Sequence, residues 1–269
     1  RVENLFFAGQ INGTTGYEEA GAQGIIAGVN AVLKVRGEAP FVLSRSDAYI
    51  GVLIDDLVTK GTQEPYRIFT SRAEHRLLLR EDNADYRLME RAREFGLIGD
   101  AVWEKYVDKK RTVNLELERL AQVRLHPSDG VNELFAEAGT APLKETAPLI
   151  DILRRPELSY RHIKQLCPSD KPLSSDAAEH VEAQVKYDGY IKRQHTQVDK
   201  LKRLESMRIP TDFDFAAPGL NLSTEGRQKL AHIRPQTLGQ AARVSGVSPA
   251  DVSSLMVLLH AHATRAQTE

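Results

Sequence analysis

The spacing of apolar residues predicts a chain that is mainly helical. Apolar side chains recur at three-, four- and seven-residue intervals in several segments, which is the period of a helix with one buried face. The segments with this period are 84–95, 101–123, 175–207, 225–232, 238–244 and 249–263. A shorter helix is expected over 47–58, and an extended, proline-containing linker is expected to begin at Thr211.

The first 37 residues carry a different pattern. The apolar run 5–8 predicts a strand, and the glycine-rich stretch 9–16 that follows it predicts a turn. A helix rich in alanine and glycine comes next and is expected to end near Arg36, because Gly37 is a typical helix stop. Such a junction offers the backbone N–H groups of a helix N-terminus to an anion, which is typical of a nucleotide-binding domain.

Composition narrows the class of protein. A hydrophobic fraction of 41% with 27% charged residues is ordinary for a globular chain, and no apolar run approaches the roughly 18 residues of a membrane span. Cys167 is the only cysteine, so neither an intrachain disulfide nor a CxxC metal site can form. The eight histidines do not cluster, and we therefore expect no metal site.

Basic residues are concentrated in two segments although the net charge is only −1. The segment 66–80, β-like over 66–70, holds four arginines and one glutamate, and the segment 186–208 holds seven basic residues against three acidic ones. Arginine can bridge phosphate oxygens and can stack on unpaired bases, so these segments suit RNA. The candidate RNA-binding residues are Arg67, Arg72, Arg76, Arg80, Lys186, Lys192 and Arg193. The alternative is a half-buried strand whose arginines pair with Glu64, Glu74 or Glu81.

The last three helices have the lengths of a helix-turn-helix, but their charge argues against DNA binding. Five basic residues are balanced by five acidic ones from Thr211 onward, and Asp251 stands near the start of the supposed recognition helix. A protein-docking bundle is the better interpretation.

Long stretches of the sequence resemble the MnmG/GidA family of FAD-dependent tRNA wobble-uridine modification enzymes. The stretches that carry the resemblance are 8–20, 61–74, 77–85, 184–187 and 234–241. They are distributed along nearly the whole length of the chain. One departure is visible, because His75 stands where the family usually carries tyrosine.

The resemblance implies a fold and a division of the chain. The fold would be mainly α, with helical C-terminal domains that follow a truncated strand–turn–helix remnant of an α/β, Rossmann-like FAD-binding domain. The expected segments are the FAD-domain remnant at 1–37, a mainly helical, tRNA-contacting domain at 38–208 and a small partner-binding bundle at 209–269. The catalytic cysteines and the first dinucleotide fingerprint would lie upstream of Arg1, so no catalytic residue is expected here.

The resemblance also implies ligands and partners. The full-length parent would bind FAD partly through Gln10, Asn12, Gly13 and Thr14, and would use NADH and a carbon derived from methylenetetrahydrofolate. It would act on tRNA in the cytoplasm as a homodimer, together with the GTPase MnmE. Glu225 and Arg234 are the candidate partner-binding residues. The rival interpretation is a nonenzymatic helical module that binds RNA or protein.

Overall fold

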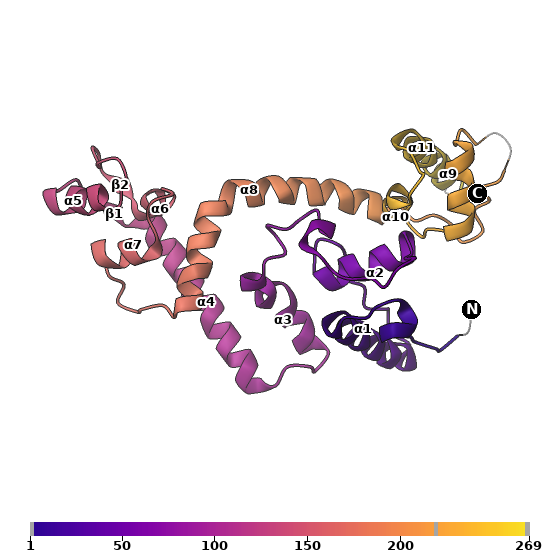
Figure 1. Cartoon of the computed structure of the whole chain (residues 1–269), viewed down its shortest axis with the longest axis horizontal. Helices are drawn as coiled ribbons and strands as arrows, with labels where there is room; N and C mark the ends of the chain where they lie inside the picture. The colour runs from indigo at the N-terminus through magenta and orange to yellow at the C-terminus, as the bar shows by residue number, and fades with distance from the viewer. Residues whose placement is uncertain (1–2, 218–219, 267–269) are drawn as a thin grey trace. The chain divides into compact units, whose positions relative to one another are not determined.

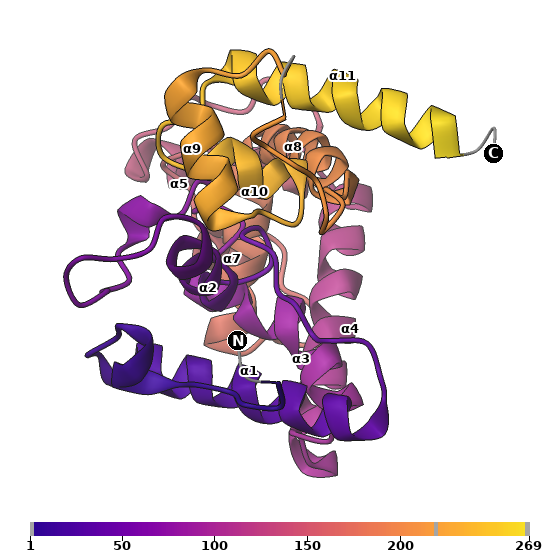
Figure 2. The same cartoon turned by 90° about the vertical axis from the view of Figure 1, so that its right-hand side faces the viewer.

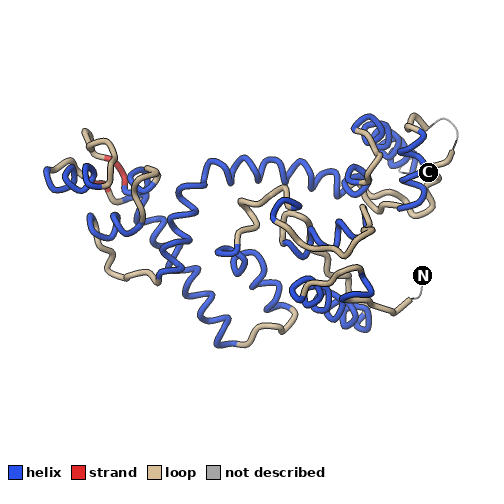
Figure 3. The backbone as a smooth tube through the Cα atoms, in the orientation of Figure 1, coloured by secondary structure: helices blue, strands red, loops and turns tan. Residues whose placement is uncertain are grey.

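The computed structural model describes residues 3–217 and 220–266, and helices dominate them (Figure 3). Figure 1 labels the helices and strands, and the expectation of a mainly helical fold is confirmed. The elements are η1 (Gly9–Asn12), α1 (Tyr17–Arg36), α2 (Tyr49–Thr59), η2 (Thr70–Arg72), η3 (Glu81–Asn83), α3 (Ala84–Glu94), α4 (Asp100–Gln122), β1 (Arg124–Leu125), α5 (Asp129–Glu137), β2 (Ala147–Pro148), α6 (Leu149–Leu153), α7 (Tyr160–Leu166), α8 (Ser175–Ser206), α9 (Thr224–Ile233), α10 (Leu238–Arg243) and α11 (Pro249–Ala266).

The chain folds into two compact units. Unit 1 comprises Arg1–Arg76 and Gln194–Glu269, and unit 2 comprises Leu77–Arg193. The sequence instead predicted three domains, at 1–37, 38–208 and 209–269. The two units are defined by contacts, so the three domains stay a prediction. Among the described residues, no helix is both long enough and apolar enough to cross a membrane.

Unit 2 is organised around one apolar core. Residues from five of its helices are fully buried there, including Leu120, Phe135, Leu149, Ile163 and Val181. Helix α4 packs against α6, and the two-residue strands β1 and β2 pair antiparallel beside them. The long helices begin and end within a few residues of the predicted positions, because their apolar faces are buried on this core.

A helix of unit 2 begins among residues that are common in turns. The sequence at 126–130 is His-Pro-Ser-Asp-Gly, and α5 begins at Asp129. The Ser128 hydroxyl accepts a hydrogen bond from the Val131 N–H and caps this helix. Burial of Phe135 on the unit 2 core supplies the stabilisation that outweighs the turn residues.

Unit 1 combines the N-terminal helices with the C-terminal bundle of α9, α10 and α11. The bundle has its own apolar core, which contains Leu230, Leu238 and Leu255. The described residues between Pro210 and α9 form no helix, as expected of a linker, but Phe215 is buried in the same core. Helix α10 also contacts α2, and Figures 1 and 2 show the two helices side by side.

The expected strand at 5–8 is wrong. These residues form no strand pairing within the described chain, and the side chains of Phe6 and Phe7 are exposed. A strand is stabilised by hydrogen bonds to a neighbouring strand, and 5–8 lack one here. The helix after the turn is confirmed, and it ends at Gly37, whose φ of 70° lies in the left-handed region.

Candidate functional site

The glycine loop, defined as residues 9–16, lies between 5–8 and α1 and is held from two sides. The Gly9 N–H donates to Gln23 Oε1 on α1 over 2.7 Å. On the other side the Tyr66 N–H donates to the Gly13 carbonyl over 2.6 Å, and Thr14 forms a single parallel β-bridge with Tyr66. Gly13 has a φ of 77°, a conformation that favours glycine. The loop is therefore fixed by side-chain and backbone contacts on both flanks.

The four candidate cofactor-binding residues lie together on this loop but differ in exposure. Gln10 and Asn12 are exposed, and the Asn12 amide donates to the Phe7 carbonyl over 2.9 Å. Gln10 makes no side-chain hydrogen bond to another described residue. Thr14 is fully buried, and its hydroxyl has no hydrogen-bond partner among the described residues. Gln10 therefore has a side chain free to reach a ligand, whereas Thr14 lies beneath the surface.

Two cavities border the glycine loop. One has a volume of about 920 Å³ and is lined mainly by apolar side chains of 6–62, together with Asn12 and Gly13. The other has a volume of about 240 Å³ and lies between Gln10, Gly13 and Thr14 on one wall and the segment 62–65 on the opposite wall. Both have the mixture of apolar and polar lining that small-molecule sites use.

A buried carboxylate joins the helix after the glycine loop to the first arginine segment. Glu19 on α1 is only 3% exposed, and its Oε1 accepts the Ile68 N–H over 2.9 Å. Arg67 Nε lies 3.4 Å from the same oxygen. The hydrogen bond from Ile68, aided by Arg67 and partly opposed by burial, lowers the pKa of Glu19. Glu19 is therefore ionised at neutral pH and fixes residues 67 and 68 against α1.

The arginines of the first basic segment differ in their contacts. Arg72 donates to the Arg67 carbonyl over 2.9 Å and stacks on the Tyr66 ring at 4.4 Å. Arg76 is exposed and has no hydrogen bond or ion pair to another described residue. Arg80 in unit 2 is paired bidentately with Asp82. Arg67 and Arg80 therefore face carboxylates, but these are Glu19 and Asp82 and not the Glu64, Glu74 or Glu81 of the alternative.

The three candidates on α8 belong to unit 2 and are partly engaged. Lys186 pairs with Glu182 at 2.9 Å, and Lys192 pairs with Asp188 at 2.9 Å. Arg193 stacks on the Tyr190 ring at 4.8 Å. Ion pairs between exposed side chains on neighbouring turns of a helix contribute little free energy. These cations can therefore exchange their partners for phosphate.

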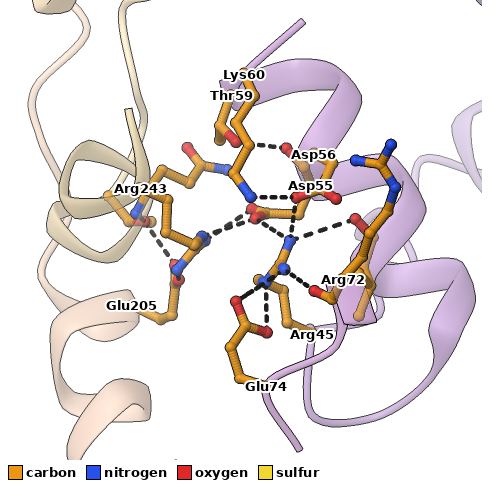
Figure 4. A network of polar contacts seen from close by, with 12 residues as sticks. Arg45, Asp55, Asp56, Thr59, Lys60, Arg72, Glu74, Glu205 and Arg243 are labelled. Carbon is orange, nitrogen blue, oxygen red and sulfur yellow. Dashed lines mark hydrogen bonds and ion pairs between the residues drawn. The ribbon is translucent and has the colours of Figure 1, made fainter. Parts of the chain in front are cut away.

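A cluster of charged residues joins α2 to α10 (Figure 4), and its members are largely buried except for Glu74 and Lys60. Its centre is Arg45, which is 8% exposed and contacts Asp55, Asp56 and Glu74 at 2.7–3.1 Å. Arg243 from α10 binds both Asp55 oxygens at 2.7 Å. Arg243 Nη1 also lies 2.5 Å from a carboxylate oxygen of Glu205 at the end of α8. We call these residues, together with Lys60, Tyr66 and Thr237, the charge cluster.

Hydrogen bonds in the charge cluster shift the pKa values of Arg45, Asp56 and Tyr66. Burial alone would lower the pKa of Arg45, but hydrogen bonds from Arg45 to Glu74 and Asp56 outweigh burial and raise it. Burial opposes ionisation of Asp56 as well, yet its bonds with Lys60, Tyr66 and Arg45 lower its pKa. Burial and the hydrogen bond to Asp56 raise the pKa of Tyr66, which stays a protonated donor. Arg45 and Asp56 therefore form a buried ion pair at neutral pH.

His75, the departure from the family pattern, belongs to the surroundings of this cluster. It is 3% exposed, its Nδ1 has no hydrogen-bond partner among the described residues, and burial lowers its pKa. His75 is thus a neutral, buried ring next to Glu74 and does not reach the surface of the glycine loop.

The two candidate partner-binding residues lie at opposite ends of one helix. Glu225 is exposed in the first turn of α9, and Arg234 is exposed directly after its last turn, with a φ of 53°. Nine residues of helix separate them by about 14 Å along the axis. The structure therefore does not bring them together into one contact point.

Asp251 has a structural role that the sequence did not reveal. It is 2% exposed and accepts four hydrogen bonds of 2.6–2.9 Å from the backbone and hydroxyl groups of Ser223 and Ser248. These serines precede α9 and α11, so one carboxylate ties the starts of both helices together. The acidic residue at the start of the supposed recognition helix is a buried cap.

Sequence reasoning missed most of the charge cluster. Arg45, Asp55, Glu205 and Arg243 are far apart along the chain and match no short motif. The available signal was the pair of adjacent carboxylates, Asp55 and Asp56, inside the apolar helix 47–58. Charged residues on an apolar helix are rarely buried without partners.

Comparison with known proteins places the chain in a family. A model of the C-terminal helical domain of the tRNA modifying enzyme MnmG/GidA matches residues 100–195, and a model of its C-terminal helical bundle matches 197–269. A third model, described as glucose inhibited division protein A, matches 1–39. The chain belongs to the MnmG/GidA family. It corresponds to the C-terminal portion of that family's proteins.

Individual relatives agree with this assignment. The tRNA uridine 5-carboxymethylaminomethyl modification enzymes MnmG of Geobacillus kaustophilus and Caldicellulosiruptor saccharolyticus are each 52% identical to 96% of this chain. The structure of Aquifex aeolicus GidA in its form II crystal is 39% identical over 96% of this chain, with a TM-score of 0.79. The chain spans 41% of the length of these curated relatives and 40% of the solved GidA chain.

The residues of the glycine loop fit a flavin nucleotide. Gly16 supplies no side-chain cap to α1, and the Glu19 carboxylate lies against Gly16 and accepts a hydrogen bond from the Glu19 backbone N–H. The donor that remains available is the exposed amide of Gln10, and the loop borders a cavity lined by Gln10, Thr15, Thr62 and Gln63 among others. Side-chain amides are donors that flavin oxygens and phosphates accept from.

Proposed function

We propose that this chain is the C-terminal part of an FAD-dependent tRNA-modifying enzyme. With a GTPase partner, the full-length parent would install the carboxymethylaminomethyl or aminomethyl group at C5 of the wobble uridine. One observation supports the proposal above all others. The peptide 66–68, which begins the arginine segment, donates hydrogen bonds to both Gly13 and Glu19. A flavin on the glycine loop and an RNA on the arginines would therefore be neighbours.

The glycine loop would hold one end of the cofactor. Gln10 would donate from its exposed amide, and Asn12, Gly13 and Thr14 would contribute the shape and backbone groups of the loop. The side chain of Asn12 is held by the Phe7 carbonyl and would position the loop. FAD, when bound, would supply the capacity to accept and release hydride.

The arginines would hold the RNA. Arg76 is the strongest candidate for phosphate, because no described residue neutralises it. Arg72 is already stacked on Tyr66, so its guanidinium presents a flat surface on which an unpaired base could stack. Arg67, Arg80, Lys186, Lys192 and Arg193 would add contacts by exchanging their carboxylate or carbonyl partners for phosphate oxygens.

The remaining parts of the proposal come from the family. NADH and a methylenetetrahydrofolate-derived carbon would be co-substrates of the full-length parent, which would act in the cytoplasm as a homodimer. MnmE would dock on the C-terminal bundle, where Glu225 and Arg234 are exposed. The chain alone would bind tRNA and partner without turnover if, as the resemblance implies, the catalytic cysteines of the family belong to another part of the full-length parent.

The cofactor assignment is tested by titrating the full-length parent with FAD and following flavin fluorescence. Gln10→Ala should weaken FAD binding about tenfold, which corresponds to the loss of one well-placed hydrogen bond. Gln228→Ala, an exposed glutamine on α9, is the matched control and should bind FAD normally. Equal affinity of Gln10→Ala and the unaltered protein would remove Gln10 from the site. A parent with no flavin absorbance would favour the nonenzymatic module instead.

A further inference from the structure

We infer that Arg243 is a positioning residue for the glycine loop and that it acts through the charge cluster and Tyr66. The inference rests on the proposed function in one respect, because that function assigns a cofactor to the glycine loop. Arg243 lies in the C-terminal bundle, whereas Gly13 lies in the N-terminal part of unit 1. A continuous series of hydrogen bonds nevertheless joins the two.

The first link is the pair between Arg243 and Asp55. Arg243 Nε and Nη2 each donate to one Asp55 oxygen over 2.7 Å, which is a bidentate geometry. Both side chains are largely buried, at 18% and 12% exposure. The pair therefore fixes both the distance and the orientation of α10 relative to α2.

The second link passes through Arg45. Its Nη1 donates to Asp55 Oδ2 over 3.1 Å and to Asp56 Oδ1 over 2.7 Å, so it bridges the two adjacent carboxylates. Asp55 Oδ2 accepts from Arg243 as well. Removing Arg243 would leave Asp55 dependent on Arg45, which would then be drawn away from Asp56.

The third link connects Asp56 to the loop. Asp56 Oδ2 accepts the Tyr66 hydroxyl over 2.8 Å, and both residues are at least 97% buried. The backbone N–H of Tyr66 donates to Gly13 over 2.6 Å. One tyrosine thus holds the cluster with its side chain and the glycine loop with its backbone.

The side chains that form these three links have low exposure, which makes the links costly to break. An unpaired charge is costly in a buried site, so the loss of one pair forces the remaining groups to rearrange. Sequence distance hides this arrangement, because 188 residues separate Asp55 from Arg243. We therefore expect that a change at Arg243 in the C-terminal bundle alters the backbone that holds the glycine loop.

Hydrogen–deuterium exchange of the full-length protein without added cofactor tests the inference itself. Arg243→Gln should raise amide exchange in the peptide covering 64–69 about tenfold, because the Tyr66 backbone loses its anchor. Tyr66→Phe should do the same by deleting the hydroxyl. Arg243→Lys keeps the charge but loses the bidentate geometry, so an intermediate rate is expected. If Arg243→Gln does not fold, Arg243→Lys takes its place in the test.

Two matched controls separate this effect from general loosening. Arg208→Gln removes an exposed arginine near the same bundle, and Asp251→Asn weakens the bundle away from the charge cluster. Both should leave exchange in 64–69 unchanged. If Asp251→Asn raises it as much as Arg243→Gln, or if Arg243→Gln and Arg243→Lys leave it unchanged, the inference is overturned.

A double-mutant cycle supplies the coupling evidence. The combined variant Arg243→Gln, Tyr66→Phe should exchange no faster than Tyr66→Phe alone, because both changes break one series. Additive effects would overturn the inference. Flavin fluorescence of the same variants then tests the cofactor. An exchange response in a protein that binds no FAD would retain the inference and reject the proposed function.

Discussion

Gly51 shows how a single position controls the packing of α2. A Cβ atom added there would collide with the backbone carbonyl oxygens of Leu43 and Ser44, which cannot rotate away. This close approach brings the segment that carries Arg45 against the helix that carries Asp55 and Asp56. The smallest side chain is therefore required for the charge cluster to form.

Gly51→Ala is predicted to destabilise the protein by about 1–3 kcal/mol, the usual cost of overpacking a buried site. The measurement is urea denaturation of the purified protein. Gly189→Ala in the middle of α8 is the control, because a Cβ atom there meets nothing within 4 Å. The control should be neutral or more stable by up to about 1 kcal/mol, since alanine is the better helix former. Equal free energies of unfolding for the two variants would mean that the backbone at 43–44 moves away from the added methyl group at little cost.

At the scale of elements, Asp251 decides how the bundle helices begin. Its four hydrogen bonds hold Ser223 before α9 and Ser248 before α11. Burial opposes ionisation, but the hydrogen bonds from Ser223 and Ser248 outweigh it and lower the pKa of Asp251 from 3.8 to about 2. The carboxylate is consequently charged at neutral pH.

Asp251→Asn is predicted to lower the free energy of unfolding by about 2–3 kcal/mol at pH 7, because buried N–H and O–H donors lose a charged acceptor. A group whose pKa is lower in the folded state stabilises the protein above its ordinary pKa. The stability difference between the two proteins should therefore be complete above pH 4 and shrink as the pH falls toward 2. Urea denaturation between pH 2 and 7 measures it, and a constant difference would contradict the assignment.

At the scale of the whole molecule, charge is arranged locally and cancels globally. The net charge of −1 gives no general attraction for RNA, so the proposed RNA binding would depend on defined cations. The structure distinguishes these cations by their partners. Arg76 has no partner among the described residues, whereas Arg67 and Arg80 already face carboxylates.

Arg76→Gln is predicted to weaken tRNA binding by the full-length parent and to make its salt dependence shallower. Loss of one phosphate contact should reduce the slope of log affinity against log salt by about 0.7–0.9. A tRNA titration at several salt concentrations measures both quantities. Lys229→Gln on α9 removes the same charge from another exposed site and should change neither. An unchanged slope for Arg76→Gln would assign the RNA surface elsewhere.

Much of the fold could be predicted because it depends on local patterns. The helices α3, α4, α8, α9, α10 and α11 all lie where the apolar period placed them. Predictions that required knowledge of neighbours were less successful. The run 5–8 has the composition of a strand without a pairing strand, and the β-like run 66–70 forms a single bridge at Tyr66.

The longer helices, the glycine loop and the family resemblance can be predicted from the sequence, because residues close together along the chain encode them. Which charges are buried and paired depends on the tertiary structure. It brings Arg243 to Asp55 across 188 positions and turns Tyr66 into the link between the charge cluster and Gly13. Burial and pairing depend on which segments pack together, and a one-dimensional pattern of residue types does not contain that information.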